Sequence, residues 1–376
     1  MAKRVFVLVL DSLGIGEDAK ANLYGDEGSN TLKSIFKSKE FKADFLTKMG
    51  LFNIDKNDYA KGVKKPVASY GRLVEKSVGK DSITGHFELM GVVLNKALPI
   101  FYNGFPDELI KKLETVWGKK IICNKPYSGT EVIKDYGREH IESGSAIVYT
   151  SADSVLQIAC HEDIIPLDEL YKMCEQAREV CRGDYEIARI IARPFVGKYP
   201  NFERSANRKD YSIDPPSETT LDRLKTKGYD VISVGKIASL FNHRGVTQEY
   251  PTKGDLMGMD KMMEIAGTEF NGLCFVNLVD FDMLYGHRND VDGYAKNLAQ
   301  VDCKIAEFIK RLKEDDLFII TADHGCDPKT KSTDHSRENV PVIVYQKNKD
   351  SKNLGIIDGF DYVGECVEKF LEEGEF

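Results

Sequence analysis

Residues 5–11 read VFVLVLD, and this stretch decides the fold class. Its six consecutive apolar residues leave no polar face, which is typical of a strand covered on both sides in a largely parallel sheet. Asp11 ends the run far short of the ~20 apolar residues that a membrane-spanning helix needs, and too early for a secretory signal. We therefore expect a buried central strand that ends in a carboxylate.

The same pattern recurs along the chain. Apolar runs occupy residues 145–152, 187–195, 230–236, 273–282, 317–325 and 340–346. Between the runs, apolar residues recur every three or four positions, the period of a helix, at 167–181, 257–267 and 292–314. Alternating strands and helices predict an α/β fold class with a doubly wound, mostly parallel sheet as its core.

The middle of the chain has a different composition. From about residue 95 to about residue 216 it is richer in Pro, Gly and Tyr, and it closes with the basic stretch NFERSANRKDYSIDPPSE at 201–218. The pair Pro215–Pro216 in that stretch is a boundary signal. We expect an inserted cap domain at 96–216 and a core domain formed by 1–95 and 217–376. The alternative is one continuous sheet with long loops.

Composition and charge exclude several function classes. The 376 residues include 52 Lys and Arg against 60 Asp and Glu, a formal net charge of -8. Neither nucleic acid nor a membrane surface is therefore an expected partner, and a phosphate ligand would need local positive charge. The eight cysteines contain no Cys-x-x-Cys pair, which favours free thiols in a reducing compartment. These features predict a cytoplasmic protein.

Acidic and histidine residues cluster at the ends of three expected strands. Open α/β sheets bind ligands just past the carboxyl ends of their strands, and Asp and His bind divalent metals such as Mn and Zn. The residues are Asp11, then Asp280, Asp282 and His287, then Asp323, His324 and His335. Two triads can be built from them, Asp282, His287 and His335 for one ion and Asp11, Asp323 and His324 for the other.

The charge of such a centre suits a phosphate. Two divalent ions and three carboxylates leave a net charge of about +1, which can hold a phosphate dianion in an acidic protein. The absence of cysteine from both triads argues against a soft-metal site. Read one at a time, each residue could instead be a helix cap, a salt-bridge partner or a core histidine.

The segment GKDSITGHFELMG at 79–91 places two hydroxyls, Ser82 and Thr84, in a lead-in to an amphipathic turn. Backbone N–H groups at a helix start favour an anion, and metal coordination makes a hydroxyl a better nucleophile toward phosphorus. The alternative is that one hydroxyl caps the helix, with His86 or Glu88 on its surface. Gly85 removes side-chain bulk beside an incoming phosphate, which favours Thr84 over Ser82 as nucleophile.

Several motifs, in order, resemble the signature blocks of the alkaline phosphatase superfamily, and within it the bacterial-type phosphopentomutase family. They are VFVLVLDSLGIG at 5–16, GKDSITGHFELMG at 79–91, NLVDFDMLYGHR at 277–288, TADHGCDP at 321–328 and TDHSRENVP at 333–341, and YTSADSVLQIACHE at 149–162 and RIIARPFVG at 189–197 are also similar. The resemblance implies an alkaline-phosphatase-like core with an inserted α+β cap. Two positions depart from the family pattern, since Ser82 is usually Thr and Phe87 is usually Trp.

The family's activity is what the resemblance implies for this chain. Ribose 1-phosphate and ribose 5-phosphate, and the 2-deoxyribose phosphates, would be interconverted through a phosphothreonine enzyme and a bisphosphate intermediate. Thr84 would be the phosphorylated nucleophile and would bridge two Mn²⁺ or other divalent ions held by the two triads. A sugar bisphosphate such as glucose 1,6-bisphosphate would be the activator, and a pentose phosphate the small-molecule substrate.

The resemblance also implies substrate-binding residues. Asp153 would contact the sugar hydroxyls, with Ser151 and Val155 beside it. The candidates for the substrate phosphate are Arg189, Arg204, Arg208 and Lys236. Rival interpretations are a metal-dependent phosphatase, a cofactor-independent phosphoglycerate mutase of the same superfamily, or a non-catalytic metal- or phosphate-binding protein. A non-catalytic binding protein would need no activatable hydroxyl such as that of Thr84. The phosphoglycerate mutase usually has a Ser nucleophile and a longer chain, so Thr84 and the chain length argue against it.

Overall fold

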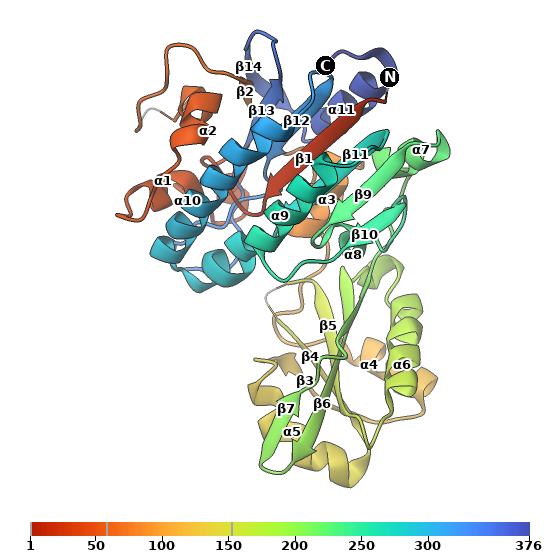
Figure 1. Ribbon diagram of the computed structural model, residues 1–376. Coiled ribbons are helices and arrows are strands. Elements are labelled where there is room, and N and C mark those ends of the chain that lie inside the picture. Colours follow the sequence, from red (N-terminus) through yellow and green to blue (C-terminus); the bar gives the residue numbers. More distant parts are fainter. Residues whose placement is uncertain (1, 58, 152) are drawn as a thin grey trace. The chain divides into compact units, whose positions relative to one another are not determined.

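The computed structural model describes residues 2–57, 59–151 and 153–376, which fall into two compact units (Figure 1). Unit 1 is discontinuous and comprises 1–97 and 215–376, whereas unit 2 is the continuous stretch 98–214. Ala152, inside the YTSADS motif, lies outside the described residues.

Unit 1 is built on an eight-stranded sheet in the order β10-β9-β11-β1-β12-β13-β2-β14. β1 (Arg4–Leu10) is buried along its whole length and lies between β11 and β12, parallel to both. Only β13 runs antiparallel to its two neighbours, so the sheet is mostly parallel. The other strands are β2 (Ser69–Val74), β9 (Asp230–Val234), β10 (Gln248–Tyr250), β11 (Gly272–Leu278), β12 (Asp316–Thr321), β13 (Val340–Gln346) and β14 (Asn353–Asp358).

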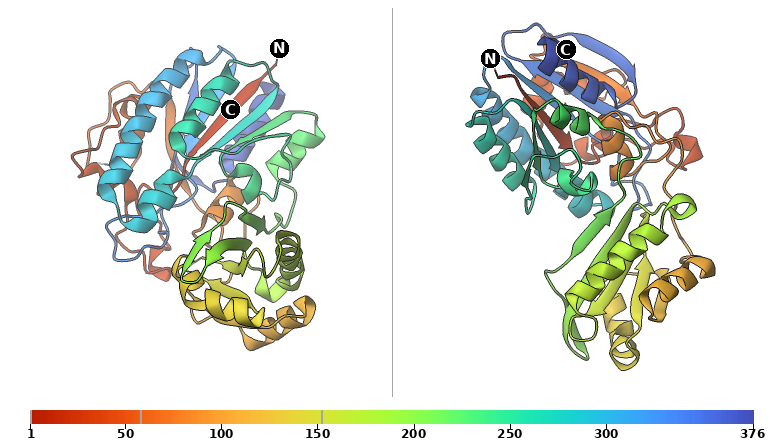
Figure 2. Two further views of the ribbon diagram at one scale, coloured as in Figure 1. Left: turned by 60° about the horizontal axis from the view of Figure 1, so that its bottom comes forward. Right: turned by 90° about the vertical axis from the view of Figure 1, so that its right-hand side faces the viewer.

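Helices cover both faces of this sheet (Figures 1 and 2). α9 (Asp255–Ala266) and α10 (Val291–Phe308) pack together on one face, and α3 (Ser82–Leu89) and α11 (Tyr362–Glu373) on the other. The buried residues of α10 recur at helical spacing, which gives it one apolar side; they include Tyr294, Leu298, Val301, Ile305 and Phe308. The shorter helices are α1 (Thr31–Phe36), α2 (Asp44–Met49), α7 (Thr220–Thr226) and α8 (Ile237–Leu240).

Unit 2 has a mixed sheet of its own in the order β3-β4-β5-β6-β7, with β8 also paired to β6. One core packs α4 and α6 against the sheet, and a second core contains residues of α5. The strands are β3 (Ile121–Pro126), β4 (Ala146–Thr150), β5 (Val155–His161), β6 (Arg189–Lys198), β7 (Asn201–Arg204) and β8 (Lys209–Ser212). The helices are α4 (Asp107–Trp117), α5 (Glu131–Ser143) and α6 (Leu167–Val180).

The expected α/β class with a mostly parallel core is confirmed. The runs 145–152 and 187–195, which fall within the expected inserted domain at 96–216, form β4 and β6 in the sheet of unit 2. Helices cover both faces of either sheet, which agrees with the burial that an apolar run indicates. The role of the inserted residues as a cap stays a prediction.

Two further observations concern the described part of the chain. None of its helices has the length and apolar character needed to cross a membrane. All eight cysteines are present there as free thiols.

Candidate metal centre

The candidate site lies at the carboxyl ends of three adjacent strands of unit 1. β1 pairs with β11 and β12 in parallel, which places Leu10 beside Leu278 and Val9 beside Thr321. The chain therefore leaves all three strands at the same edge of the sheet. Asp11 follows β1 directly, Asp323 and His324 follow β12, and Asp282 lies in a π-helical turn after β11.

Asp11, Asp323 and His324 form one buried group. His324 Nε2 lies 3.4 Å from Asp11 Oδ1 and 3.3 Å from Asp323 Oδ2. The other oxygen of each carboxylate is already held, since Asn277 Nδ2 donates to Asp11 Oδ2 (2.8 Å) and the Ser12 N–H donates to Asp323 Oδ1 (3.1 Å). One oxygen of each carboxylate therefore faces the histidine and is available to a cation.

Asp282 connects this group to the two remaining histidines. Its Oδ2 lies 3.2 Å from His287 Nε2 and its Oδ1 lies 3.4 Å from His335 Nε2. His287 Nδ1 lies 2.6 Å from the Thr333 carbonyl oxygen, so Nδ1 donates a hydrogen to this carbonyl, and the contact directs Nε2 toward Asp282. The ring centroids of His335 and His324 are 4.1 Å apart. The structure thus brings all six predicted ligands into one contiguous cluster.

The grouping of the six differs in one respect from the two predicted triads. The possible ligand atoms of Asp282, His324 and His335 all lie within 4.8 Å of one another, and so do those of Asp282, His287 and Cys326. Cys326 was not predicted, so the premise that no cysteine lies beside these ligands is wrong. Its Sγ donates to the Asp334 carbonyl oxygen, and burial raises the pKa of its thiol, which favours the protonated form over a thiolate ligand.

The buried atoms of the cluster fit divalent cations. Asp11 Oδ1, Asp282 Oδ1, Asp323 Oδ2 and His335 Nε2 have no hydrogen-bond partner among the described residues. Buried polar atoms without partners are costly in a folded protein unless an ion or water satisfies them. Four such atoms of the types that bind Mn and Zn, gathered in one place, are therefore suited to metal ions.

Burial and the charges within the cluster give its side chains unusual proton affinities. Burial, with the charges of Asp323 and Asp282, raises the pKa of Asp11 to about 7. Burial would also raise the pKa of Asp282, but His335 and His287 hold it well below its usual range. Burial opposes protonation of His287, yet Asp282 raises the pKa of this imidazole to about 12. Positive charge is thus strongly favoured here, as protons or as cations.

The first turn of α3 lies against this cluster. Ser82 Oγ lies 3.1 Å from His324 Nε2, and the Thr84 hydroxyl donates to Asp81 Oδ2 at 2.6 Å. Asp81 is the N-cap and accepts from the N–H groups of Ile83 and Thr84, so the expectation that Ser82 or Thr84 caps the helix is wrong. Both hydroxyls lie in the helix itself rather than in an extended lead-in.

Two neighbours of Thr84 have roles that differ from the expected ones. A Cβ on Gly85 would lie 2.0 Å from the Asp323 carbonyl oxygen, so this glycine permits close contact between α3 and the Asp323 loop. His86 was considered as a surface residue, but it is fully buried, and its Nδ1 lies 3.1 Å from Asp323 Oδ2. Helical periodicity could not show this, because the residue it contacts is more than two hundred positions away in the sequence.

The predicted sugar-binding residues lie in unit 2 near the paired starts of β5 and β6. Val155 and Arg189 are register partners in these parallel strands. Arg189 Nη2 lies 3.5 Å from Asp153 Oδ2, and the Asp153 N–H donates to Ser151 Oγ at 3.4 Å. The structure therefore brings Ser151, Asp153, Val155 and Arg189 together.

The other predicted arginines also lie in unit 2. Arg204 donates from Nε to the Gly129 carbonyl oxygen, and Arg208 forms two hydrogen bonds of 2.6 Å with Asp210. Arg193, in the RIIARPFVG block, was not singled out from the sequence, and its Nε donates to Gln157 Oε1 at 3.0 Å. Burial and the charge of Arg208 lower the pKa of Arg193 to about 10, so its guanidinium is still charged at neutral pH.

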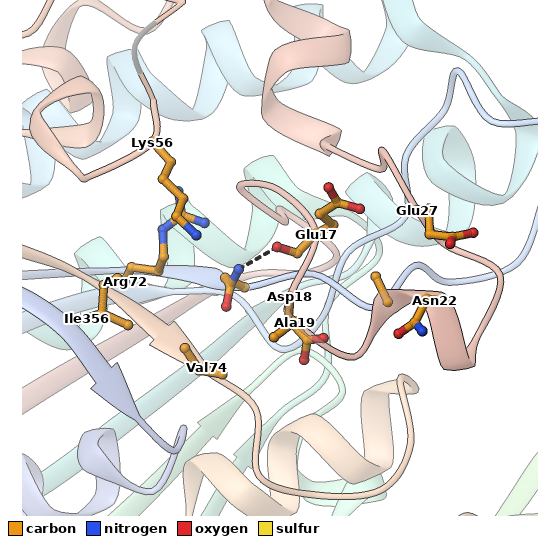
Figure 3. Close-up of a pocket in the computed structure, with 11 residues that line it drawn as sticks. Glu17, Asp18, Ala19, Asn22, Glu27, Lys56, Arg72, Val74 and Ile356 are labelled. Atoms are coloured by element: carbon orange, nitrogen blue, oxygen red, sulfur yellow. Dashed lines mark hydrogen bonds between the residues drawn. The ribbon is translucent and has the colours of Figure 1, made fainter.

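Lys236 lies in unit 1, at the N-terminus of α8. It lines a cavity of about 600 Å³ together with Ser233, His243 and Asp280, past the carboxyl end of β9. A different cavity of unit 1, of about 430 Å³, is lined by none of the predicted site residues (Figure 3). Both acidic and basic side chains line it, among them Glu17, Glu27, Lys56 and Arg72. It therefore has no uniformly positive surface for a phosphate.

Comparison with known proteins defines the class first. Residues 3–372 match the family model described as the Metalloenzyme superfamily. The solved structure of the PH0037 protein from Pyrococcus horikoshii matches with a TM-score of 0.53 at 13% identity, covering 100% of this chain and 99% of that one. At that identity the likeness shows the fold alone. The family match and the ligand cluster together support binding of divalent metal ions.

Curated relatives narrow the class. The phosphopentomutase of Lachnoclostridium phytofermentans is 52% identical over 99% of this chain and 99% of its own length. The phosphopentomutase of Carboxydothermus hydrogenoformans is 50% identical over 99% of this chain and 97% of its own length. The chain therefore belongs to the phosphopentomutase family within the metalloenzyme superfamily.

Proposed function

We propose that this chain is a phosphopentomutase that interconverts ribose 1-phosphate and ribose 5-phosphate, and the corresponding 2-deoxyribose phosphates. The observation that carries the proposal is the cluster of six Asp and His side chains at the ends of β1, β11 and β12, against which the first turn of α3 is packed. Relatives of about 50% identity over nearly the full length support the choice of reaction.

Two divalent cations, in our proposal Mn²⁺, would be held by the cluster. Asp11, Asp323 and His324 would hold one, and Asp282, His287 and His335 the other. Bound there, the ions would neutralise phosphate charge and lower the proton affinity of a coordinated hydroxyl. The unpartnered buried atoms of Asp11, Asp282, Asp323 and His335 support this assignment.

Thr84 is the proposed nucleophile, and its position in α3 suits that role. The Thr84 hydroxyl gives its proton to Asp81 Oδ2, which accepts its hydrogen bond, and its oxygen attacks one phosphorus of a sugar bisphosphate. An O–P bond forms to Thr84 as the bond from that phosphorus to the sugar oxygen breaks, and the sugar oxygen takes up the proton. In the return step the free hydroxyl of a pentose monophosphate loses its proton and attacks phospho-Thr84, and the Thr84 oxygen leaves and regains a proton. The positive end of the α3 dipole lies at its N-terminus and favours the negative charge of the phosphothreonine, while Asp81 holds the N–H groups of Ile83 and Thr84.

The residues of unit 2 have a positioning role in this proposal. Asp153, with Ser151 and Val155 beside it, binds the sugar hydroxyls and orients the ring. Arg189, Arg204 and Arg208 of unit 2 are the proposed ligands of the phosphate that is not being transferred, and Lys236 of unit 1 is a separate candidate for binding phosphate. Holding the sugar by its hydroxyls allows either phosphate of the bisphosphate to be presented for transfer, and exclusion of water protects the phosphoenzyme from hydrolysis.

A single assay tests the proposal. Purified protein is incubated with Mn²⁺ and ribose 5-phosphate, with and without glucose 1,6-bisphosphate, and ribose 1-phosphate and free phosphate are followed separately. A mutase gives ribose 1-phosphate, faster with the bisphosphate, and little free phosphate. Free phosphate as the main product identifies a phosphatase instead and contradicts the proposal.

A further inference from the structure

His86 links the helix of the nucleophile to the candidate metal cluster. Its Nδ1 lies 2.8 Å from the Ser82 carbonyl oxygen, one turn earlier in α3, and 3.1 Å from Asp323 Oδ2. Its Nε2 lies 3.3 Å from Asn277 Nδ2. Asn277 is the second-last residue of β11. The ring is fully buried, so these are contacts of the protein interior and not of a solvated side chain.

The neighbours of the ring define where its hydrogen is. Both atoms that face Nδ1 are oxygens without a hydrogen to give, a main-chain carbonyl and a carboxylate, so Nδ1 carries the hydrogen. The orientation of the Asn277 amide follows from Asp11, whose Oδ2 receives Nδ2 at 2.8 Å. The second hydrogen of the same amide group then points to His86 Nε2, which accepts it.

These contacts form a chain of four buried side chains. It runs from Asp11 through Asn277 and His86 to Asp323, and each member is at most 1% exposed. Its two ends are the two carboxylates of the group that contains His324. The hydrogen bond from Asn277 occupies Oδ2 of Asp11 and leaves Oδ1 without a hydrogen bond. The bridge therefore constrains the directions in which both carboxylates face the cluster.

We infer that His86 and Asn277 are positioning residues for the metal ion held by Asp11, Asp323 and His324, and that they fix α3 relative to that ion. The inference rests on the proposed function, because it concerns the ions assigned there. Neither residue is a ligand of the ion. Since Thr84 lies in the same helix as His86, the bridge sets the position of the nucleophile and of the carboxylates together.

Metal binding measured by calorimetry tests the inference, with Mn²⁺ as the probe and the full chain in its metal-free form. His86→Asn retains an N–H near the position of Nδ1 and loses the acceptor for Asn277. Asn277→Leu removes both amide donors with little change in volume. We expect each variant to weaken one of two Mn²⁺ sites by about 10–100-fold, the range found when groups that orient metal ligands are replaced, and to leave the other site unchanged.

The double variant and two further backgrounds identify the affected site. His86→Asn combined with Asn277→Leu should weaken binding little more than either alone, because both break the same bridge. Asp11→Asn removes the Mn²⁺ site that depends on the bridge. In this background, His86→Asn should not change the Mn²⁺ affinity of the site that remains. With Asp282→Asn, which leaves the Asp11 site, it should still weaken binding by the same factor.

His140→Asn is the matched control. His140 is also fully buried, its Nδ1 lies 2.6 Å from the Ser145 carbonyl oxygen, and its Nε2 accepts the His161 N–H, but it lies in unit 2. It should change thermal stability without changing either Mn²⁺ affinity. Equal weakening of both sites by His86→Asn, or of neither, overturns the inference. If the unsubstituted protein binds no Mn²⁺, the proposed function fails instead.

Discussion

Ser82 Oγ lies 3.1 Å from His324 Nε2, whereas the hydroxyl of Thr84, two residues later in α3, donates to Asp81. Two hydroxyls of one helical turn thus have different partners, and only one can be in line with phosphorus. Thr84 is the predicted phosphate carrier. Its side chain is fully buried, and Asp81 fixes the position of its oxygen.

Thr84→Ala should abolish both the phosphoenzyme and the mutase activity, while Ser82→Ala should keep a measurable part of both. Thr84→Ser, which keeps a hydroxyl at this position, is the control. Intact-mass spectrometry after incubation with glucose 1,6-bisphosphate measures the adduct. A phosphate adduct that survives in Thr84→Ala and is missing in Ser82→Ala would assign the nucleophile to Ser82.

Metal content should depend on both halves of the cluster. Asp11→Ala and His335→Ala should each lose at least one of two bound ions, because each removes a ligand atom that has no hydrogen-bond partner. Elemental analysis of the purified variants gives the stoichiometry. Asp302→Asn is the control, since Asp302 is buried but accepts from the N–H groups of Phe45 and Leu46 instead. Unchanged metal content in both cluster variants would rule out the two-ion assignment.

Asp153→Ala should depress mutase turnover while metal content and thermal stability stay nearly unchanged. Asp153 is partly exposed, at 30% of its side chain, so its removal leaves no cavity and costs little stability. Steady-state kinetics with ribose 5-phosphate and a melting curve separate the two effects. Equal losses of activity and of stability would indicate that Asp153 has a local structural role.

The stability of unit 1 should fall with rising pH because of Asp255. Burial raises the pKa of this carboxyl to about 7 in the folded protein, above the ordinary value of ~3.9. The folded state therefore binds a proton that the unfolded state has lost. The stabilisation is complete below pH ~4 and is lost as the pH rises toward about 7, with no further change above it.

Asp255→Asn removes this titration. The free energy of unfolding of the variant, measured in urea at pH 5, 6, 7 and 8, should rise relative to that of the unsubstituted protein between pH 5 and 7, by a few kcal/mol at most, and then stay level. The Asp280 N–H and the Asn297 amide each donate a hydrogen bond to one oxygen of Asp255. An asparagine has only one oxygen to accept them, which lowers the variant's stability equally at every pH. A difference that does not vary with pH would contradict the prediction.

Local pattern predicted seven of the fourteen strands in the described part of the chain, and the residue types of the candidate metal cluster. The run 340–346 coincides with β13, and the strand ends placed Asp11, Asp282 and Asp323 at one edge because parallel strands share that edge. The pairing order of the strands was not predictable, since pairing partners are chosen by contacts far away in the sequence.

Some site residues were missed or misread, and only part of them had a local signal in the sequence. Asp81 is a strong N-cap type, and the sequence rule for caps could have favoured it over Ser82 and Thr84. His86 and Cys326 show no local signal, because their roles depend on Asp323 and Asp282 in other segments. Spacing identifies residues at strand ends, but the partners that orient them come from tertiary packing.

The central position of β1 has a consequence for the order of folding. Arg4, at the start of β1, donates to Asp316, 312 residues later, so the middle of the large sheet cannot close until nearly the whole chain has been synthesised. Residues 98–214 form a continuous unit with its own two cores, so this unit can fold before the C-terminal part of the chain has been synthesised. During translation the inserted unit can therefore fold first, while the apolar β1 segment stays unpaired and exposed to aggregation until its partner strands have been synthesised.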